Sequence, residues 1–280
     1  MAYAKTRLAI ALGSARSDAA LVRLGGKLRA PKLLASAQTG VPIGRLAEDD
    51  APALGEVFRQ LAKSLPTAAK RADVPLFVSL PEALVREALL HFKEFPKSHR
   101  EAQELVLARV RRDASDEDFD PLCSFERLDD SDGVVIRARS IDRARRDRVE
   151  QAACSAGFHI SRLEGWIGFL RPAFAQIVKD GACLQSDGAS WSLSCWSHDK
   201  QHSFSDSGWL DHGDEHLQAK WHRLMQSFQL RHSLPPLTLL ILSPSELLPS
   251  VIPETVGETL PNDPRIGPAD LQARGVAIWG

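Results

Sequence analysis

The sequence predicts a two-lobed α/β protein in which one structural unit occurs twice. Two stretches, about 7–80 and 182–242, each contain short apolar segments separated by glycine-containing turns. Each stretch then continues with an amphipathic segment and a buried apolar run. Read as three strands, a helix and a strand, the two stretches give the duplicated arrangement that a two-lobed α/β fold requires. A chain of 280 residues is long enough for two such lobes.

Between the two units, a stretch at about 81–140 interrupts the repeated pattern. The first lobe is expected to span residues 1–165 and to carry this insertion. The second lobe is expected to span 166–280, with a closing helix that returns to the first lobe. The elements below support this division in chain order.

The first lobe follows from short local signals. It is expected to contain strands at 7–12, 19–24, 27–36 and 76–80 and a helix at 51–65. Gly25 and Gly26 predict a tight hairpin between the second and third strands. Pro31 marks the third strand as an edge strand or a broken one, because proline lacks the N–H that a central strand donates.

Local sequence signals also predict the elements of the insertion and of the end of the first lobe. They are expected to contain helices at 82–92, at 98–112 and from 140 or 142 to 156, a hairpin of strands at 123–128 and 133–139, and a strand at 158–164. Pro81 suits the first position of a helix. Ser98 and Glu101 form a capping box, and Gly157 is typical of a helix end.

The second lobe repeats the pattern of the first. It is expected to contain helices at 166–178 and 212–230 and strands at 182–186, 191–197, 202–209 and 237–242. Trp191 and Trp196 lie five positions apart in one strand, so they are expected on opposite faces, one inward and one outward. A core position is the leading interpretation for the tryptophans of this lobe. Because tryptophan is also enriched at binding hot spots, the lobe is a reasonable place for an interaction surface as well.

Composition narrows the class of function. The net charge is −1, and 44% of residues are hydrophobic, which is ordinary for a soluble protein and gives no basic excess for nucleic acid. No apolar run is long enough to cross a bilayer. The four cysteines form no CxxC pair, which favours a reduced, cytosolic protein. We therefore expect no nucleic-acid partner and no metal site.

Three segments carry a resemblance to a known family. They are the run at 8–14 followed by 19–24, the proline-led amphipathic segment at 95–109, and the closing segment at 268–279. In order and spacing they resemble the actin, sugar-kinase and Hsp70 superfamily, and more narrowly the PilM-like proteins of type IV pilus assembly and the cytoplasmic domains of type II secretion L proteins. The resemblance implies an actin-like fold, in which an RNase H-like unit is duplicated and the first lobe carries a small inserted α+β subdomain, here at about 81–140.

The resemblance also locates a degenerate nucleotide cleft. Its remnants are expected at Gly13, Ser14, Asp187, Gly188 and Ser245. Members that hydrolyse ATP place an aspartate two residues before each phosphate-turn glycine, where this chain has Ala11 and Ser186. Mg²⁺ requires oxygen ligands there. The adenosine loop has Ser243-Pro244-Ser245 in place of a glycine pair. We expect no catalytic residue and no cofactor; ATP is possible but disfavoured.

The function implied by the resemblance is that of a scaffold. The chain is expected to be a non-catalytic cytoplasmic component of a pilus or secretion assembly platform, held at the inner membrane by a single-span partner. In the family, a short cytoplasmic N-terminal peptide of the partner lies in a groove between the first lobe and the insertion. Here Leu105, Arg109 and Phe125 are the residues expected to line that groove.

Two alternatives stay open. One is an enzyme, a divergent ATP-binding kinase or ATPase of the same superfamily that uses Asp187, since a one-residue bulge would turn this side chain into the cleft. The other is the cytoplasmic domain of a type II secretion L protein. Titration with Mg²⁺ and ATP separates the enzyme from the scaffold.

Overall fold

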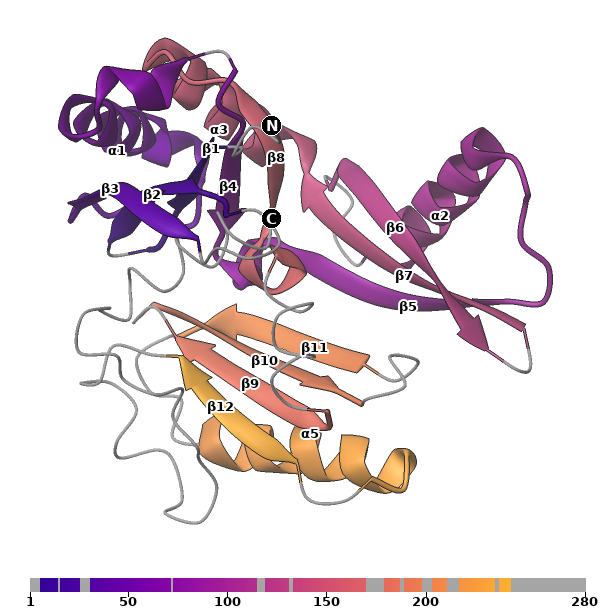
Figure 1. Cartoon of the computed structure of the whole chain (residues 1–280). Helices are drawn as coiled ribbons and strands as arrows, with labels where there is room; N and C mark the ends of the chain where they lie inside the picture. The colour runs from indigo at the N-terminus through magenta and orange to yellow at the C-terminus, as the bar shows by residue number, and fades with distance from the viewer. Residues whose placement is uncertain are drawn as a thin grey trace.

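The strands in the described part of the chain form three sheets, and two of these sheets share one topology. The computed structural model describes residues 6–14, 16–25, 31–71, 73–114, 119–130, 133–169, 179–186, 189–197, 203–210, 217–234 and 237–242. The two larger sheets lie one above the other, and the third extends to one side of the first (Figure 1).

The first sheet has five strands in the order β3-β2-β1-β4-β8. Their bounds are β1 Thr6–Ala11, β2 Ser17–Arg23, β3 Lys32–Thr39, β4 Leu76–Leu80 and β8 Ile160–Gly165. Strands β1, β2 and β3 are antiparallel neighbours, whereas β4 and β8 run parallel to β1. Helices α1 (Ala51–Ser64) and α3 (Arg143–Ser155) cover one face.

The two faces of this sheet have separate cores. Alternate residues of β1 point to opposite faces, so Leu8 and Ile10 pack in the large cluster with Phe58 of α1 and Val149 of α3. On the other face, Ala9, Ala11, Ala20 and Val22 pack against Phe169, which is 1% exposed. Burial on both faces accounts for the apolar runs that predicted these strands.

The second sheet repeats the order of the first with four strands, β11-β10-β9-β12. Their bounds are β9 Gly181–Ser186, β10 Ser190–Trp196, β11 Ser203–Trp209 and β12 Thr238–Leu242. Strands β9, β10 and β11 are antiparallel neighbours, and β12 runs parallel to β9. Helix α5 (Leu217–Arg231) packs on the face that carries Trp191 and Leu193. The duplication predicted from the sequence is thus present in strand order and direction.

The third sheet, β5-β7-β6, belongs to the inserted stretch. Strands β5 (Arg86–Phe92), β6 (Pro121–Asp130) and β7 (Gly133–Asp142) are antiparallel neighbours, and helix α2 (His99–Asp113) packs on one face. Short 3₁₀ turns complete the connections, at η1 Glu48–Asp50, η2 Thr67–Lys70 and η3 Glu82–Leu84.

One predicted helix is wrong. Residues 82–92 form η3 and then strand β5, not a helix. Ala88, Leu90 and Phe92 alternate along β5 and face α2, and the backbone pairs with β7 over all seven residues. Tertiary pairing therefore overrides the helix-forming tendency of this leucine- and alanine-containing segment.

Other local predictions are met in part. The helix residues predicted at 170–178 and 212–216, the turn glycine Gly26 and the closing segment at 268–279 lie outside the described residues. The third strand lies at Lys32–Thr39, beyond Pro31, and it is an edge strand as expected. Asp142 caps α3 by accepting a hydrogen bond from the Arg145 N–H, and Gly157 follows the helix with φ of +83°. Ser98 is the N-cap residue of α2, although its side chain makes no capping hydrogen bond.

The prediction that one of the two tryptophans of β10 faces outward is also wrong, because Trp191 and Trp196 are both 3% exposed. The second sheet is covered on both faces: α5 lies over Trp191, and Trp166, which follows β8, contacts Ser192 on the opposite face. Among the described residues, no helix combines the length and the apolar character that a bilayer crossing needs.

Candidate functional site

A pocket of about 320 Å³ opens where the first sheet meets the insertion. Strand β8 forms one wall, strands β6 and β7 form another, and α3 closes one side. The lining residues are Val85, Leu122, Cys123, Ser124, Arg139, Ser140, Ile141, Arg146, Glu150, Ile160, Ser161, Arg162, Leu163 and Glu164. We call this pocket the β6–β8 groove. Strands β6 and β8 each stand last in the order of their sheet, so each presents an edge.

Apolar side chains share the lining of the groove with serines and with charged side chains that pair with one another. Leu122, Ile141, Ile160 and Leu163 are only partly buried. Arg146 lies 2.6 Å from a carboxylate oxygen of Glu150, so this lining pair neutralises itself. An occupant with apolar side chains and little net charge fits such a lining.

Cys123 lines the groove without offering reactive chemistry. Burial raises the pKa of its thiol to about 11, although the nearby charge of Arg111 acts in the opposite direction. At neutral pH the thiol is therefore protonated, and a protonated thiol is a poor nucleophile. Within the described parts of the chain, no three His, Cys, Asp or Glu side chains are grouped as metal ligands.

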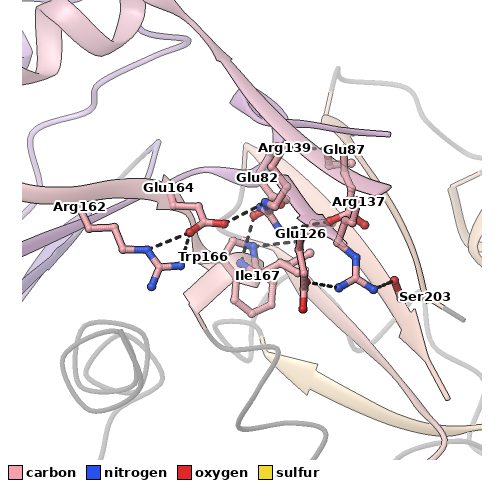
Figure 2. A network of polar contacts seen from close by, with 12 residues as sticks. Glu82, Glu87, Glu126, Arg137, Arg139, Arg162, Glu164, Trp166, Ile167 and Ser203 are labelled. Carbon is pink, nitrogen blue, oxygen red and sulfur yellow. Dashed lines mark hydrogen bonds and ion pairs between the residues drawn. The ribbon is translucent and has the colours of Figure 1, made fainter. Parts of the chain in front are cut away.

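The floor of the groove is a buried arginine surrounded by carboxylates (Figure 2). Arg139 of β7 forms ion pairs with Glu82 of η3, with Glu87 of β5 at 3.3 Å and with Glu164 of β8 at 3.2 Å. Its side chain is only 7% exposed. Burial alone would lower the pKa of Arg139, but the charges of the three glutamates outweigh this effect and raise the pKa.

This network, which we call the Arg139 cluster (Arg139, Glu82, Glu87 and Glu164), ties the first sheet to the insertion. The second oxygen of Glu82 accepts a hydrogen bond from the Ile167 N–H at 3.1 Å, at the start of the helix that begins at Trp166. Gly165 precedes that helix, and a Cβ there would lie 2.7 Å from a guanidinium nitrogen of Arg139. Only glycine leaves room for this approach.

Gly13 and Ser14 lie at the turn after β1, as predicted. The Gly13 N–H donates to the Ser17 hydroxyl at 3.4 Å, and the buried Ser14 carbonyl accepts from the Ile43 N–H at 3.1 Å. Both hydrogen bonds join the turn to neighbouring segments of the same chain. The other predicted cleft residues, Asp187, Gly188 and Ser245, lie outside the described residues.

The position expected to hold the first aspartate of an ATPase is occupied by Ala11, which is 2% exposed in the apolar cluster of that sheet face. Ala11 is paired across the strands with Asp18, so both side chains point to the same face. Asp18 is buried and pairs with Arg16 at 2.7 Å. The carboxylate on the cross-strand neighbour of Ala11 is therefore neutralised by a nearby arginine.

Leu105, Arg109 and Phe125 lie apart from the groove. Phe125 packs with Phe95 and His99 between the inserted sheet and the start of α2. Arg109 lies on the exposed side of α2 and pairs with Asp113 at 3.0 Å, and Leu105 is half-buried on the same helix. None of the three lines the β6–β8 groove. Their role in partner binding stays a prediction.

The sequence reading missed the Arg139 cluster. Arg139 belongs to the arginine-rich stretch 137–148, where surface charge is the ordinary expectation, whereas the structure buries it. The signal was present as alternation: Arg137 and Arg139 alternate with Ile136 and Ala138 along β7. Glu126 is paired with Arg137 across one side of β7, and Glu87 is paired with Arg139 across the other. Recognition of this pattern required 86–92 to be a strand.

Comparison with known proteins shows that the fold of this chain is similar to that of several solved structures. No family model matches the chain, and no curated protein matches it. A chain of the PilM–PilN type IV pilus biogenesis complex is 17% identical over 97% of this chain and 86% of that chain, with a TM-score of 0.66. The cytoplasmic domain of EpsL, an inner membrane component of the type II secretion system of Vibrio cholerae, is 15% identical over 97% and 94%, with a TM-score of 0.57.

A third similar structure is a Bacteroides thetaiotaomicron protein with an actin-like ATPase fold and unknown function. It is 10% identical over 85% of this chain and 82% of that chain, with a TM-score of 0.50. The resemblance predicted from the sequence is therefore confirmed in structure. The chain has the two-lobed actin-like fold, and it is similar to PilM-like proteins and to the cytoplasmic domains of type II secretion L proteins.

Proposed function

We propose that this chain is a non-catalytic actin-like scaffold of a type IV pilus or type II secretion assembly platform. It binds a cytoplasmic segment of an inner-membrane partner in the β6–β8 groove and is held at the membrane through that partner. The fold likeness supports this proposal, since one similar structure belongs to a PilM–PilN complex and another to an inner membrane component.

The observation that carries the proposal is the groove between two edge strands. An extended peptide adds to a sheet edge through its backbone hydrogen bonds, and pockets beside the edge select its side chains. The edges of β6 and β8 meet this requirement, and the apolar walls at Leu122, Ile160 and Leu163 receive the side chains. A volume of about 320 Å³ suits a few side chains of such a segment.

The lack of catalysis in this proposal rests on Ala11. An alanine methyl group cannot ligate Mg²⁺ or activate water, and phosphate charge at this turn would lack the metal that neutralises it. The carboxylate of Asp18, the cross-strand neighbour of Ala11, is already paired with Arg16. The function that we propose therefore depends on surfaces that bind a polypeptide and not on phosphate chemistry at this turn.

A substitution that fills the β6–β8 groove tests whether the peptide binds there. Ser161 is exposed on β8 and lines the groove, so Ser161→Trp places an indole in the path of the peptide. The probe is a peptide with the cytoplasmic N-terminal segment of the proposed partner, to be identified as a single-span inner-membrane protein whose gene adjoins the gene of this chain. We expect Ser161→Trp to weaken capture of this peptide at least tenfold, about 1.4 kcal/mol.

Two further variants make the result specific. Ser64→Trp adds the same side chain at an exposed position at the end of α1, outside the groove, and is expected to bind normally. Arg109→Glu tests the location predicted from the sequence alone. Unchanged capture by Ser161→Trp, together with loss by Arg109→Glu, would move the binding site to α2 and overturn the groove assignment.

A further inference from the structure

Strand β11 forms a seam between the second sheet and the rest of the chain. It stands last in the order of its sheet, and in Figure 1 it is the strand of that sheet nearest to β5. Ser203, Ser207 and Trp209 are separated by even numbers of residues, so their side chains lie on one face of the strand. Each of the three contacts an element that precedes β8 in the sequence.

These contacts run from one end of β11 to the other. The Ser203 hydroxyl accepts a hydrogen bond from Arg137 of β7 (Figure 2). The Ser207 hydroxyl donates to the backbone carbonyl of Glu82 at 3.2 Å. Trp209 packs against the core of the first sheet. At about 3.3 Å per residue, the seam is roughly 20 Å long.

Arg45 adds a contact at the Trp209 end of the seam. Its guanidinium carbon lies 5.2 Å from the centre of the Trp209 ring. The arginine belongs to the loop that follows β3, in which Ile43 and Leu46 are buried in the core of the first sheet. This loop therefore joins the first-sheet core to the end of β11.

A second row of contacts lies on β10, the neighbour of β11. The indole N–H of Trp166 donates to the Ser192 hydroxyl at 3.2 Å, and Ser192 donates to Gln185 of β9 at 3.3 Å. Trp166 and Ser192 are each 1% exposed. Buried polar groups joined in this way fix the relative position of the elements that carry them.

We propose that β11 is a built-in latch, which holds the two lobes in one relative orientation through the chain's own side chains and thereby keeps the β6–β8 groove preformed. The link between latch and groove is Glu82. Its carboxylate binds Arg139 on the groove floor, and its backbone carbonyl binds Ser207 of the latch. The effect on the groove rests on the proposed function; the latch itself does not.

The latch is tested on the full chain by pulsed electron–electron double resonance. Spin labels on ketone-bearing residues at positions 64 and 227, both exposed and one in each lobe, leave the cysteines native. The double variant Arg137→Met/Arg45→Ala cuts the seam near both ends without changing β11 or the groove lining. We expect a narrow distance distribution in the parent chain, unchanged by Mg·ATP, and a distribution roughly twice as wide in the double variant.

Peptide binding is measured on the same variants with the probe peptide described above. If only a fraction of the molecules keeps the groove formed, the apparent Kd equals the intrinsic Kd divided by that fraction. We expect the apparent Kd of the double variant to increase about fivefold or more. Ser207→Ala, which changes no charge, is expected to act in the same direction with a smaller effect and guards against misfolding of the double variant.

The outcomes separate the two proposals. A broad distribution in the parent chain, or one that Mg·ATP narrows, overturns the latch. A widened distribution in the double variant with an unchanged Kd overturns preformation of the groove. If Ser161→Trp leaves peptide binding intact while the distances behave as expected, the latch stands and the docking function fails.

Discussion

Replacing Arg139 by methionine is expected to lower the free energy of unfolding by about 3–5 kcal/mol, because it leaves buried carboxylates without their cation. Glu82 and Glu87 are 3% and 5% exposed, and both pair with Arg139 in the parent chain. Methionine is close to arginine in length and apolar, so the loss reflects charge more than volume. Urea denaturation followed by circular dichroism measures the change.

The pH dependence of this loss has a definite sign. In the parent chain the pKa of Arg139 is raised from an already high value, so its contribution is constant across the neutral range. In the variant, burial and mutual repulsion favour the protonated form of the orphaned carboxyls in the folded state. The folded state then binds more protons than the unfolded state, and the deficit shrinks as pH falls.

The matched control for Arg139→Met is Arg109→Met on α2. Arg109 is 44% exposed and pairs with Asp113 along the helix, so its loss is expected to cost less than about 1 kcal/mol. Equal effects of the two substitutions, or a deficit at Arg139 that grows as pH falls, would contradict the role assigned to the Arg139 cluster.

Restoring a carboxylate at the first phosphate turn is expected to destabilise the fold and to restore no ATPase activity. Ala11→Asp buries a charge in an apolar cluster and places it directly opposite Asp18. An uncompensated buried polar group costs about 2–7 kcal/mol, and the like charge adds to this. Thermal unfolding and a phosphate-release assay are the measurements.

The control for Ala11→Asp is Ala144→Asp, which puts the same side chain at an exposed position in the first turn of α3. An acid near a helix N-terminus is neutral or slightly favourable, so stability should change by less than about 0.5 kcal/mol. A stable Ala11→Asp variant that hydrolyses ATP would show that the cleft is intact except for one side chain.

Much of the fold could be predicted from the sequence because its signals are local. The apolar run of β1, the three- and four-residue spacing in α1, and the cap of α3 by Asp142 each act within a few residues. The hairpin of β6 and β7 was also visible. The segment at 82–92 was misread because its choice between helix and strand depends on pairing with β7, which lies far along the chain.

The groove and its floor were harder to predict for the same reason. They join η3, β5, β7 and β8, and the sequence separation between Glu82 and Arg139 is 57 residues. The residues predicted for the partner groove lie on α2 and β6 and do not line the β6–β8 groove, so their role in partner binding stays a prediction. Arg139 looked like a surface charge until Glu82, Glu87 and Glu164 were seen around it.

The central claim is that this chain binds a partner polypeptide and does not turn over ATP. Isothermal titration calorimetry on the full chain tests it most directly, with the partner's cytoplasmic peptide as titrant in the absence and presence of Mg·ATP. We expect one peptide per chain, with a micromolar Kd that Mg·ATP leaves unchanged, and no phosphate release. ATP hydrolysis that Asp187→Ala abolishes, in a chain that binds no peptide, would contradict the claim.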